Sequence, residues 1–138
     1  MSNFSLSIHQ TGLSAQQTLL NDYRLAWISR EASLLGRKEV LTGKAKFGIF
    51  GDGKELAQIA MARAFKKGDW RSGYYRDQTF MMAIGELTIR QYFAALYAHT
   101  DVEQEPASGG RQMGGHYATR TIDQNGDWKN LMEMYNSS

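Results

Sequence analysis

The chain has 138 residues, of which 42% are hydrophobic and 22% charged, a composition typical of a folded domain. It contains no cysteine, which excludes disulfides, thiolate nucleophiles and thiolate metal sites. The formal net charge of +2 is too small to indicate nucleic acid as a partner.

The first segment, residues 1–14, mixes polar and scattered apolar residues without a sustained period, so we expect an arm that another surface orders. Residues 1–7 have neither a basic cluster nor a long apolar run, which argues against a secretory signal. The longest apolar stretches, such as residues 80–84, are far shorter than the roughly 18 residues that span a bilayer. We therefore expect a cytoplasmic protein without a membrane span.

A long helix is predicted to begin at Ser14 or Ala15, because neither Gly nor Pro interrupts the sequence before Gly36. Apolar residues recur in it at helical spacing, namely Leu20, Tyr23, Trp27 and Leu34. Basic residues gather over residues 30–46. This cluster favours a solvated helix face, with a nearby anionic ligand as the alternative.

Residues 36–53 are predicted to form a loop, because five glycines punctuate them. At its end, Asp52 and Glu55 form a D-x-x-E pattern ahead of alternating small and apolar residues. In a capping box, Asp52 would accept from the amide three residues on while Glu55 reaches back to the Asp52 amide. A second helix is therefore expected to start there and to end near residues 66–68.

Three shorter elements are expected next. The aromatic stretch 70–75 predicts a strand or an extended link, and residues 79–84 and 87–99 predict two helical pieces around Gly85. Three methionines in apolar helical segments are predicted to be core residues: Met61, Met81 and Met82. Residues 101–118 form a glycine-rich polar loop, of a length that is usually functional or disordered, and residues 128–135 predict a short helix.

Residues 51–53 have the sequence G-D-G, which resembles the first three residues of the metal-binding signature of thiamine-diphosphate enzymes. That signature ends with an Asn further along the chain. The first Asn after the triplet is Asn125, which is too far away. We therefore assign Asp52 to helix capping and no residue of the chain to a metal.

Two segments carry chemically suggestive residues. Arg76, beside Tyr74 and Tyr75, supplies a planar fork for phosphate oxygens, although an arginine next to aromatic rings is more often a cation–π or salt-bridge contact. Residues 111–116 combine Arg, Gln and a histidine in a glycine-rich stretch. This stretch is either a catalytic loop or an exposed loop with a solvent histidine. The other histidines, His9 and His99, are expected at the surface.

Taken in order, five segments resemble the thiamine-diphosphate-dependent decarboxylase component of 2-oxo acid dehydrogenase complexes, in its alpha subunit or the alpha half of a fused chain. They are the helix of residues 23–43, the G-K-E-x-A of residues 53–57, the G-D of residues 68–69, the Y-R-D of residues 75–77 and the G-R-Q-M-x-x-H-Y of residues 110–117. The last motif is most similar to the branched-chain (2-oxoisovalerate) type. The resemblance covers residues 20–120.

This resemblance implies a mainly α fragment, with residues 15–138 as the incomplete N-terminal part of an α/β three-layer thiamine-diphosphate-binding domain. It implies that Tyr75 and Arg76 hold the diphosphate and that His116 is catalytic. It also implies a substrate pocket, formed by Phe47, Arg111, Gln112 and Tyr117. The implied activity is decarboxylation of a 2-oxo acid on thiamine diphosphate with Mg, whose ligands we expect beyond this chain, followed by acyl transfer to a lipoyl domain.

The implied partners are a beta subunit or beta region and a lipoyl-bearing acyltransferase component, within an oligomeric parent. Lys54, Ile49 and the glycines before His116 depart from common family residues, so the preferred 2-oxo acid stays open. We expect the chain to be an N-terminal fragment that is inactive alone. The alternatives are a self-contained helical interaction module, which should be monodisperse, and a phosphate binder that uses Arg76 and Arg111.

Overall fold

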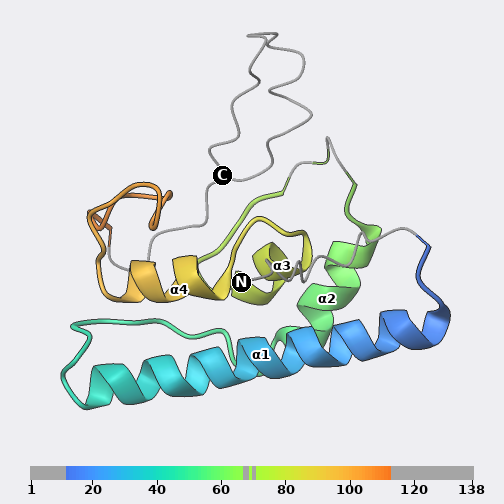
Figure 1. The fold of residues 1–138 in the computed structure, drawn as a ribbon, viewed down its shortest axis with the longest axis horizontal. Coiled ribbons are helices and arrows are strands. Elements are labelled where there is room, and N and C mark those ends of the chain that lie inside the picture. The colour runs from blue at the N-terminus through green and yellow to red at the C-terminus, as the bar shows by residue number, and fades with distance from the viewer. Residues whose placement is uncertain (1–11, 67–68, 70, 113–138) are drawn as a thin grey trace, which may run out of the picture.

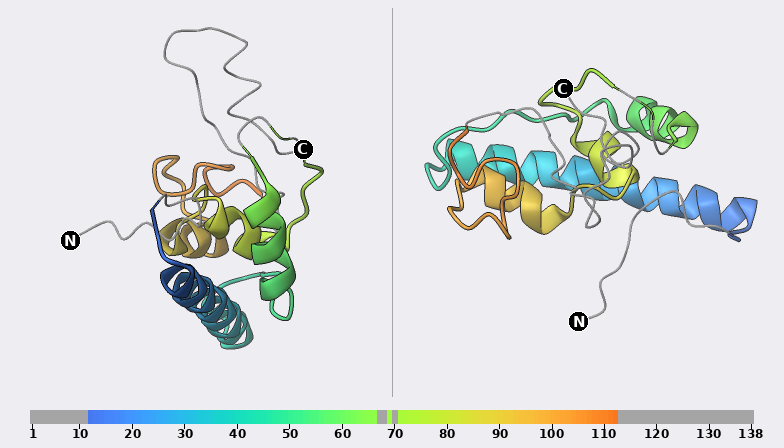
Figure 2. Two further views of the ribbon diagram at one scale, coloured as in Figure 1. Left: turned by 90° about the vertical axis from the view of Figure 1, so that its right-hand side faces the viewer. Right: turned by 90° about the horizontal axis from the view of Figure 1, so that it is seen from above.

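A computed structural model describes residues 12–66, 69 and 71–112 of the chain. Its helices are α1 (Ala15–Leu41), α2 (Glu55–Ala64), α3 (Gln78–Ala83) and α4 (Ile89–Leu96), and the described residues include no strand. The shorter helices lie against one side of α1, with α4 over its C-terminal half (Figure 1). The right-hand view of Figure 2 shows that α1 extends beyond the other helices at its N-terminal end. The prediction of a mainly α chain is confirmed.

Helix α1 begins as predicted, because the Ser14 hydroxyl accepts from the Gln17 amide while the Gln17 side chain binds the Ser14 amide. The predicted end at Gly36 is wrong, since the helix continues to Leu41. Gly36 serves close packing instead, because a Cβ atom there would lie 2.6 Å from Cε1 of Phe50. The turn after the helix falls at Gly43, whose φ of 77° favours glycine.

The predicted capping box of α2 is also wrong. The residue before the helix is Lys54, without a side-chain cap, and Asp52 instead pairs with Arg37 of α1 at 2.6 Å. The Glu55 carboxylate accepts from the Gly53 amide and binds Arg30 of α1. Two guanidinium groups on α1 attract these carboxylates more strongly than the neutral amides of a helix start.

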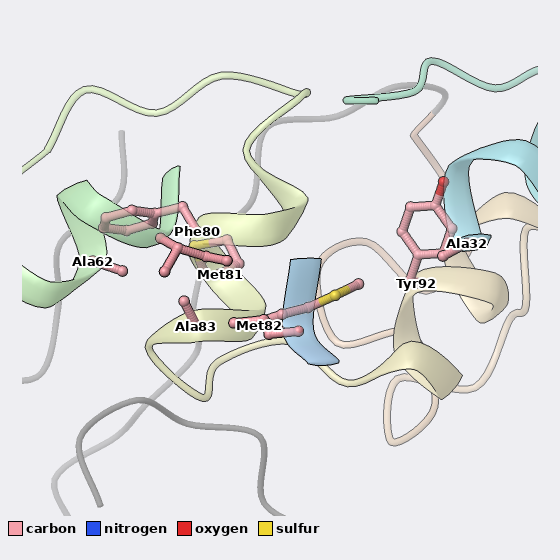
Figure 3. Close-up of a cluster of buried hydrophobic side chains, with 9 residues drawn as sticks. Ala32, Ala62, Phe80, Met81, Met82, Ala83 and Tyr92 are labelled. Atoms are coloured by element: carbon pink, nitrogen blue, oxygen red, sulfur yellow. The ribbon is translucent and has the colours of Figure 1, made fainter. Parts of the chain in front are cut away.

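Helix α3 forms the centre of the core, because all six of its residues are buried. The core cluster combines residues from all four helices: Leu25, Ala32, Ile59, Ala62, Phe80, Met81, Met82, Ala83 and Tyr92 (Figure 3). Met81 and Met82 are core residues as predicted, whereas Met61 is 59% exposed, which corrects its assignment to the core. Met61 is exposed because of its position around the helix axis: Ile59 and Ala62 lie on the face of α2 that packs against the core, and Met61 lies on the other face.

The remaining predictions are confirmed in part. Residues 78–83 and 89–96 are helical, which matches the two pieces expected around Gly85, and α2 ends at Ala64, slightly earlier than predicted. Residue 69 and residues 71–75 form an irregular link rather than a strand. The short helix predicted for residues 128–135 and the arm of residues 1–11 lie outside the described residues. Of the described helices, none is both long enough and apolar enough to cross a bilayer.

Candidate cofactor and substrate site

A cavity of about 470 Å³ lies between α4, the segment 44–50 and the turn at residues 105–108. Ligand pockets commonly have volumes of about 300 to 1,000 Å³, so this cavity is large enough for an organic molecule. Three predicted site residues line it, namely Phe47, Tyr75 and Gln112. The structure therefore brings together residues that are as much as 65 positions apart in the sequence (47 to 112).

Arg76 and Arg111 are not part of the cavity wall. The Arg76 guanidinium lies over the ring of the lining residue Tyr75, and the Arg111 guanidinium donates to the carbonyl of the lining residue Ser108 at 3.3 Å, so both lie at the margin of the cavity. His116 and Tyr117, the remaining predicted site residues, lie outside the described residues. The exposed surface position predicted for His99 is confirmed, whereas His9 lies outside the described part.

The Tyr75–Arg76 pair is held in a compact aromatic and cationic arrangement. The rings of Tyr74 and Tyr75 are 3.9 Å apart, and the Tyr74 hydroxyl donates to the Tyr75 hydroxyl at 2.5 Å, a contact that raises the pKa of Tyr74. The Arg76 guanidinium carbon lies 4.9 Å from the centre of the Tyr75 ring. The cation–π interpretation of this segment is therefore confirmed, and it is compatible with a phosphate contact because the edge of the guanidinium keeps its N–H donors.

No carboxylate in the described part of the chain forms an ion pair with Arg76. The neighbouring Asp77 is engaged elsewhere, because it accepts from the Arg71 guanidinium and from the Tyr74 amide at 2.8 Å each. The Arg76 backbone is fixed by Gln58, whose amide nitrogen donates to the Arg76 carbonyl at 3.0 Å. The same Gln58 accepts from the Phe80 amide at 3.0 Å. Arg76 thus has a fixed backbone and a cationic group that no carboxylate of these residues neutralises.

The turn before Gln112 is organised by Glu105, which the sequence analysis did not single out. Its buried carboxylate accepts from the amides of Ala107, Ser108 and Gly110 at 2.8 to 3.0 Å and from the Ser108 hydroxyl at 2.6 Å. Burial acts to raise the pKa of Glu105, but these hydrogen bonds outweigh it and hold the pKa below its ordinary value. This turn could have been predicted from the sequence, because the carboxylate of Glu105 stands two to five positions before small residues and glycines whose amides it can accept from.

The hydrogen bonds of this turn also fix the backbone of the predicted pocket residues Arg111 and Gln112. The Ser108 hydroxyl oxygen accepts from the amides of Arg111 and Gln112 at 3.1 and 3.2 Å. Glu105 therefore positions Ser108, and Ser108 positions the start of the R-Q-M motif at the cavity. The polar loop predicted for residues 101–118 is compact over its described residues, 101–112.

Another part of the cavity wall is fixed by Glu39 near the end of α1. Its carboxylate accepts from the Tyr97 hydroxyl at 2.7 Å and pairs with Lys44 at 3.3 Å. The hydrogen bond from Tyr97 lowers the pKa of Glu39, and burial opposes it, while the same contact raises the pKa of Tyr97. Tyr97 and Lys44 both line the cavity, so Glu39 links two of its walls. Glu39 also was not singled out from the sequence.

Comparisons with known proteins identify the family of the chain. The model of the dehydrogenase E1 component family matches residues 23–129. The chain belongs to the dehydrogenase E1 component family. The 2-oxoisovalerate dehydrogenase subunit alpha of Bacillus subtilis (strain 168) is 31% identical over 121 residues, which are 84% of this chain and 34% of that relative. This dehydrogenase E1 chain thus spans about a third of the relative's length, and no solved structure matches it significantly.

Dehydrogenase E1 components use thiamine diphosphate, generally with a divalent metal. The residues of this chain fit the cofactor in two respects, because Arg76 offers a cation that no described carboxylate neutralises, and the adjoining cavity has room for an organic ring. The described residues include no comparable site for the metal. Among the described residues no three potential ligands gather, and Asp52 of the G-D-G triplet is bound by Arg37.

Proposed function

We propose that this chain is the cofactor-binding N-terminal part of the decarboxylase component of a 2-oxo acid dehydrogenase complex of the branched-chain type. The supporting observation is that Phe47, Tyr75 and Gln112, which come from three separate motifs, line one cavity beside Arg76. The branched-chain assignment is supported by the similarity to a relative named 2-oxoisovalerate dehydrogenase subunit alpha. The proposed substrate is 2-oxoisovalerate or a close branched-chain 2-oxo acid.

Each predicted site residue receives a role under this proposal. Arg76 binds diphosphate oxygens through its planar fork, and the Tyr75 hydroxyl donates a further hydrogen bond. Phe47 contributes an apolar wall that keeps water from the reacting region, and Gln112 orients a polar group of the substrate. Arg111 attracts the substrate carboxylate from the margin of the cavity. Thiamine diphosphate supplies the electron sink for the decarboxylation when it is bound.

We assign His116 as the catalytic residue and Tyr117 to the substrate pocket. An imidazole ring nitrogen can accept or donate a proton, which is the chemistry that a residue beside the reacting centre would supply. Both residues follow Gln112 within five positions. The Ser108 hydroxyl orders Arg111 and Gln112, the first residues of the same motif, and Gln112 lines the cavity.

The proposal includes partners and a location. The chain pairs with a beta subunit or beta region, passes its acyl product to a lipoyl-bearing acyltransferase component, and works in the cytoplasm within an oligomeric enzyme. The 138-residue chain alone is proposed to be inactive, because the described residues gather no metal ligand set. Release of carbon dioxide from 2-oxoisovalerate by the purified chain, with thiamine diphosphate and Mg²⁺ added, would contradict this part of the proposal.

The decisive test substitutes Arg76 in the enzyme assembled with its beta subunit. Arg76→Ala should raise the thiamine-diphosphate concentration for half-maximal activity at least about ten-fold, because a charge-assisted, bidentate contact is lost. Arg90→Ala is the matched control, since Arg90 is exposed on α4 and outside the cavity wall. An unchanged cofactor requirement in Arg76→Ala would overturn the assignment. Comparing 2-oxoisovalerate with pyruvate as substrates tests the branched-chain preference.

A further inference from the structure

The segment that follows α1, residues 44–50, forms one wall of the cavity and is here called the wall segment. It carries Phe47 and runs back alongside α1 (Figure 1). Within the described part of the chain, the backbone amides of residues 46–50 donate no hydrogen bond. The position of Phe47 therefore depends on how the two ends of the wall segment are held.

The end of the wall segment that leads to α2 is held independently of the other end. The Gly51 amide donates to the Gln78 side chain at 3.2 Å, and Arg37 of α1 donates to the Asp52 carboxylate at 2.6 Å. These two contacts keep residues 51 and 52 in place when the other end of the segment moves. A change at that other end should therefore shift the wall without unfolding the chain.

The other end of the wall segment is held by Glu39, near the end of α1. The Glu39 carbonyl accepts from the amides of Lys44 and Ala45 at 3.0 Å each, which fastens the segment to α1. The Glu39 carboxylate accepts from the Tyr97 hydroxyl at 2.7 Å and from the Lys44 ammonium group at 3.3 Å. Because Tyr97 directly follows α4, the carboxylate fixes the distance between the wall segment and the end of that helix.

The contact with Tyr97 is the stronger of the two that the Glu39 side chain makes. Lys44 keeps 66% of its side chain exposed, so water screens its charge. A phenol that donates to a largely buried carboxylate forms a charge-assisted hydrogen bond. The Tyr97 ring is also held by stacking on the Phe93 ring, at 6.4 Å between their centroids. Loss of the hydrogen bond between Glu39 and Tyr97 should therefore let the wall segment and α4 move apart.

We propose that Glu39 is a positioning residue that selects the substrate of this cavity through its hydrogen bond to Tyr97. This bond sets the spacing between the wall segment and α4, and so sets the size of the 2-oxo acid side chain that fits beside Phe47. Tyr97 and Phe47 line the cavity, whereas Glu39 does not. The inference rests on the proposed function, because it concerns the substrate of the same site.

Steady-state kinetics of the enzyme assembled with its beta subunit tests the proposal. Glu39→Ala and Tyr97→Phe should each raise KM for 2-oxoisovalerate at least about three-fold and change kcat less than about two-fold, because a wider cavity holds the branched side chain less closely. Pyruvate has only a methyl group to lose contacts, so its kcat/KM should fall less. The ratio of kcat/KM for 2-oxoisovalerate to that for pyruvate should therefore decrease in both variants.

A conservative variant and two controls accompany this measurement. Glu39→Gln keeps an oxygen that can accept from the Tyr97 hydroxyl, so it should retain most of the original selectivity. Glu31→Ala and Tyr23→Phe are the matched controls, because both positions are exposed on α1 and outside the cavity wall, and they should leave both KM values unchanged. A loss of selectivity in Glu39→Gln as large as that in Glu39→Ala would overturn the role of the hydrogen bond.

A double-mutant cycle completes the test. Tyr97→Phe should add nothing to the KM of Glu39→Ala, because both substitutions remove the same hydrogen bond. Effects that multiply in the double variant, or a fall in kcat of equal size for both substrates, would overturn the proposal. Tyr97→Phe removes a single hydroxyl group, so its selectivity decides the matter if Glu39→Ala does not fold. A changed cofactor requirement in Arg76→Ala, together with unchanged selectivity in Tyr97→Phe, would refute this inference and leave the proposed function standing.

Discussion

The Arg30 guanidinium binds the Glu55 carboxylate through two hydrogen bonds, of 2.7 and 2.8 Å, and so fastens the start of α2 to the middle of α1. The hydrogen bond from Arg30 lowers the pKa of Glu55, burial opposes it, and the Gly53 amide adds to the lowering. This carboxylate does two tasks at once, because it joins two helices and also satisfies an amide before α2.

Replacing Glu55 should therefore weaken the fold. Glu55→Gln removes the charge and one of the two parallel contacts, and we expect the free energy of unfolding to fall by about 1 to 2 kcal/mol, because water screens the half-exposed Arg30. Urea denaturation followed by circular dichroism measures the change. The matched control is Glu103→Gln at an exposed position, where the expected change is within about 0.5 kcal/mol. Equal effects of the two substitutions would contradict the prediction.

Acidification should remove the contribution of Glu55 and Glu105. Both carboxyls have a pKa below 4.5 in the folded chain, whereas the unfolded chain binds these protons near 4.5. Their contribution is therefore complete above pH 4.5 and declines as the pH falls through the folded-state values. Denaturation at about pH 7, 5, 4 and 3 should show the gap between the original chain and Glu55→Gln shrinking only below pH 4.5. If the difference in the free energy of unfolding between the two proteins increased in acid, the predicted direction of the pH dependence would be wrong.

A methyl group at Gly36 should destabilise the chain, although alanine is the better helix former. The new Cβ would lie 2.6 Å from Phe50 Cε1 and 3.3 Å from the Tyr92 hydroxyl, so the partly buried ring of Phe50 must move. We expect Gly36→Ala to lower the free energy of unfolding by about 1 to 3 kcal/mol, as other overpacked sites do. Gln16→Ala, at an exposed position of the same helix, is the control and should change little. A more stable Gly36→Ala variant would rule out the tight contact.

Gln78 should be intolerant of an apolar replacement of similar size. It is fully buried, donates to the Ser33 hydroxyl at 2.6 Å and accepts from the Gly51 amide at 3.2 Å. Gln78→Leu leaves both partners buried without this hydrogen bond, and we expect a loss of about 2 to 4 kcal/mol. Calorimetric melting measures it. Gln16→Leu serves as the exposed control, and a loss no larger than the control's would refute the prediction.

Glu105 should protect the turn that leads to Gln112. In Glu105→Gln one oxygen becomes an amide nitrogen, so in either orientation of the side chain at least one of the backbone N–H donors, those of Ala107, Ser108 and Gly110, faces an NH₂ group instead of an acceptor. The turn should open more often, and trypsin should cleave after the exposed Arg111 at least several times faster than in the original chain. Mass spectrometry of timed digests gives the rate. The Glu103→Gln control should keep the original rate, and an unaltered rate in Glu105→Gln would argue against its role.

Helical periodicity carried most of the fold prediction. The start of α1 and the presence of α2, α3 and α4 follow from local patterns, which depend on residues three and four positions apart. The wrong predictions concern positions whose structure depends on residues far away in the sequence. Gly36 looked like a helix end because the ring of Phe50, which needs its small size, lies fourteen positions away in sequence. Asp52 and Glu55 looked like a capping box because the arginines of α1 that bind them cannot be located from a local pattern.

The candidate site shows the same division. Phe47, Tyr75 and Gln112 were predicted from a family resemblance, and they do line one cavity, although their roles remain proposals. Glu39 and Glu105 escaped notice because an isolated glutamate in a sequence is usually a solvated surface residue. Their importance comes from burial and from partners that only the folded chain supplies, among them Tyr97, which lies 58 positions from Glu39.

The double engagement of Gln58 has a consequence for the kinetics of binding. The buried side-chain amide of Gln58 binds both the Arg76 carbonyl and the Phe80 amide. The backbone at Arg76 therefore cannot move away from the core while α3 remains packed against it. An incoming anion therefore meets a preorganised surface and needs little conformational ordering on arrival. In hydrogen–deuterium exchange, the Phe80 amide should exchange only through global opening of the chain, on a far slower timescale than the exposed turns.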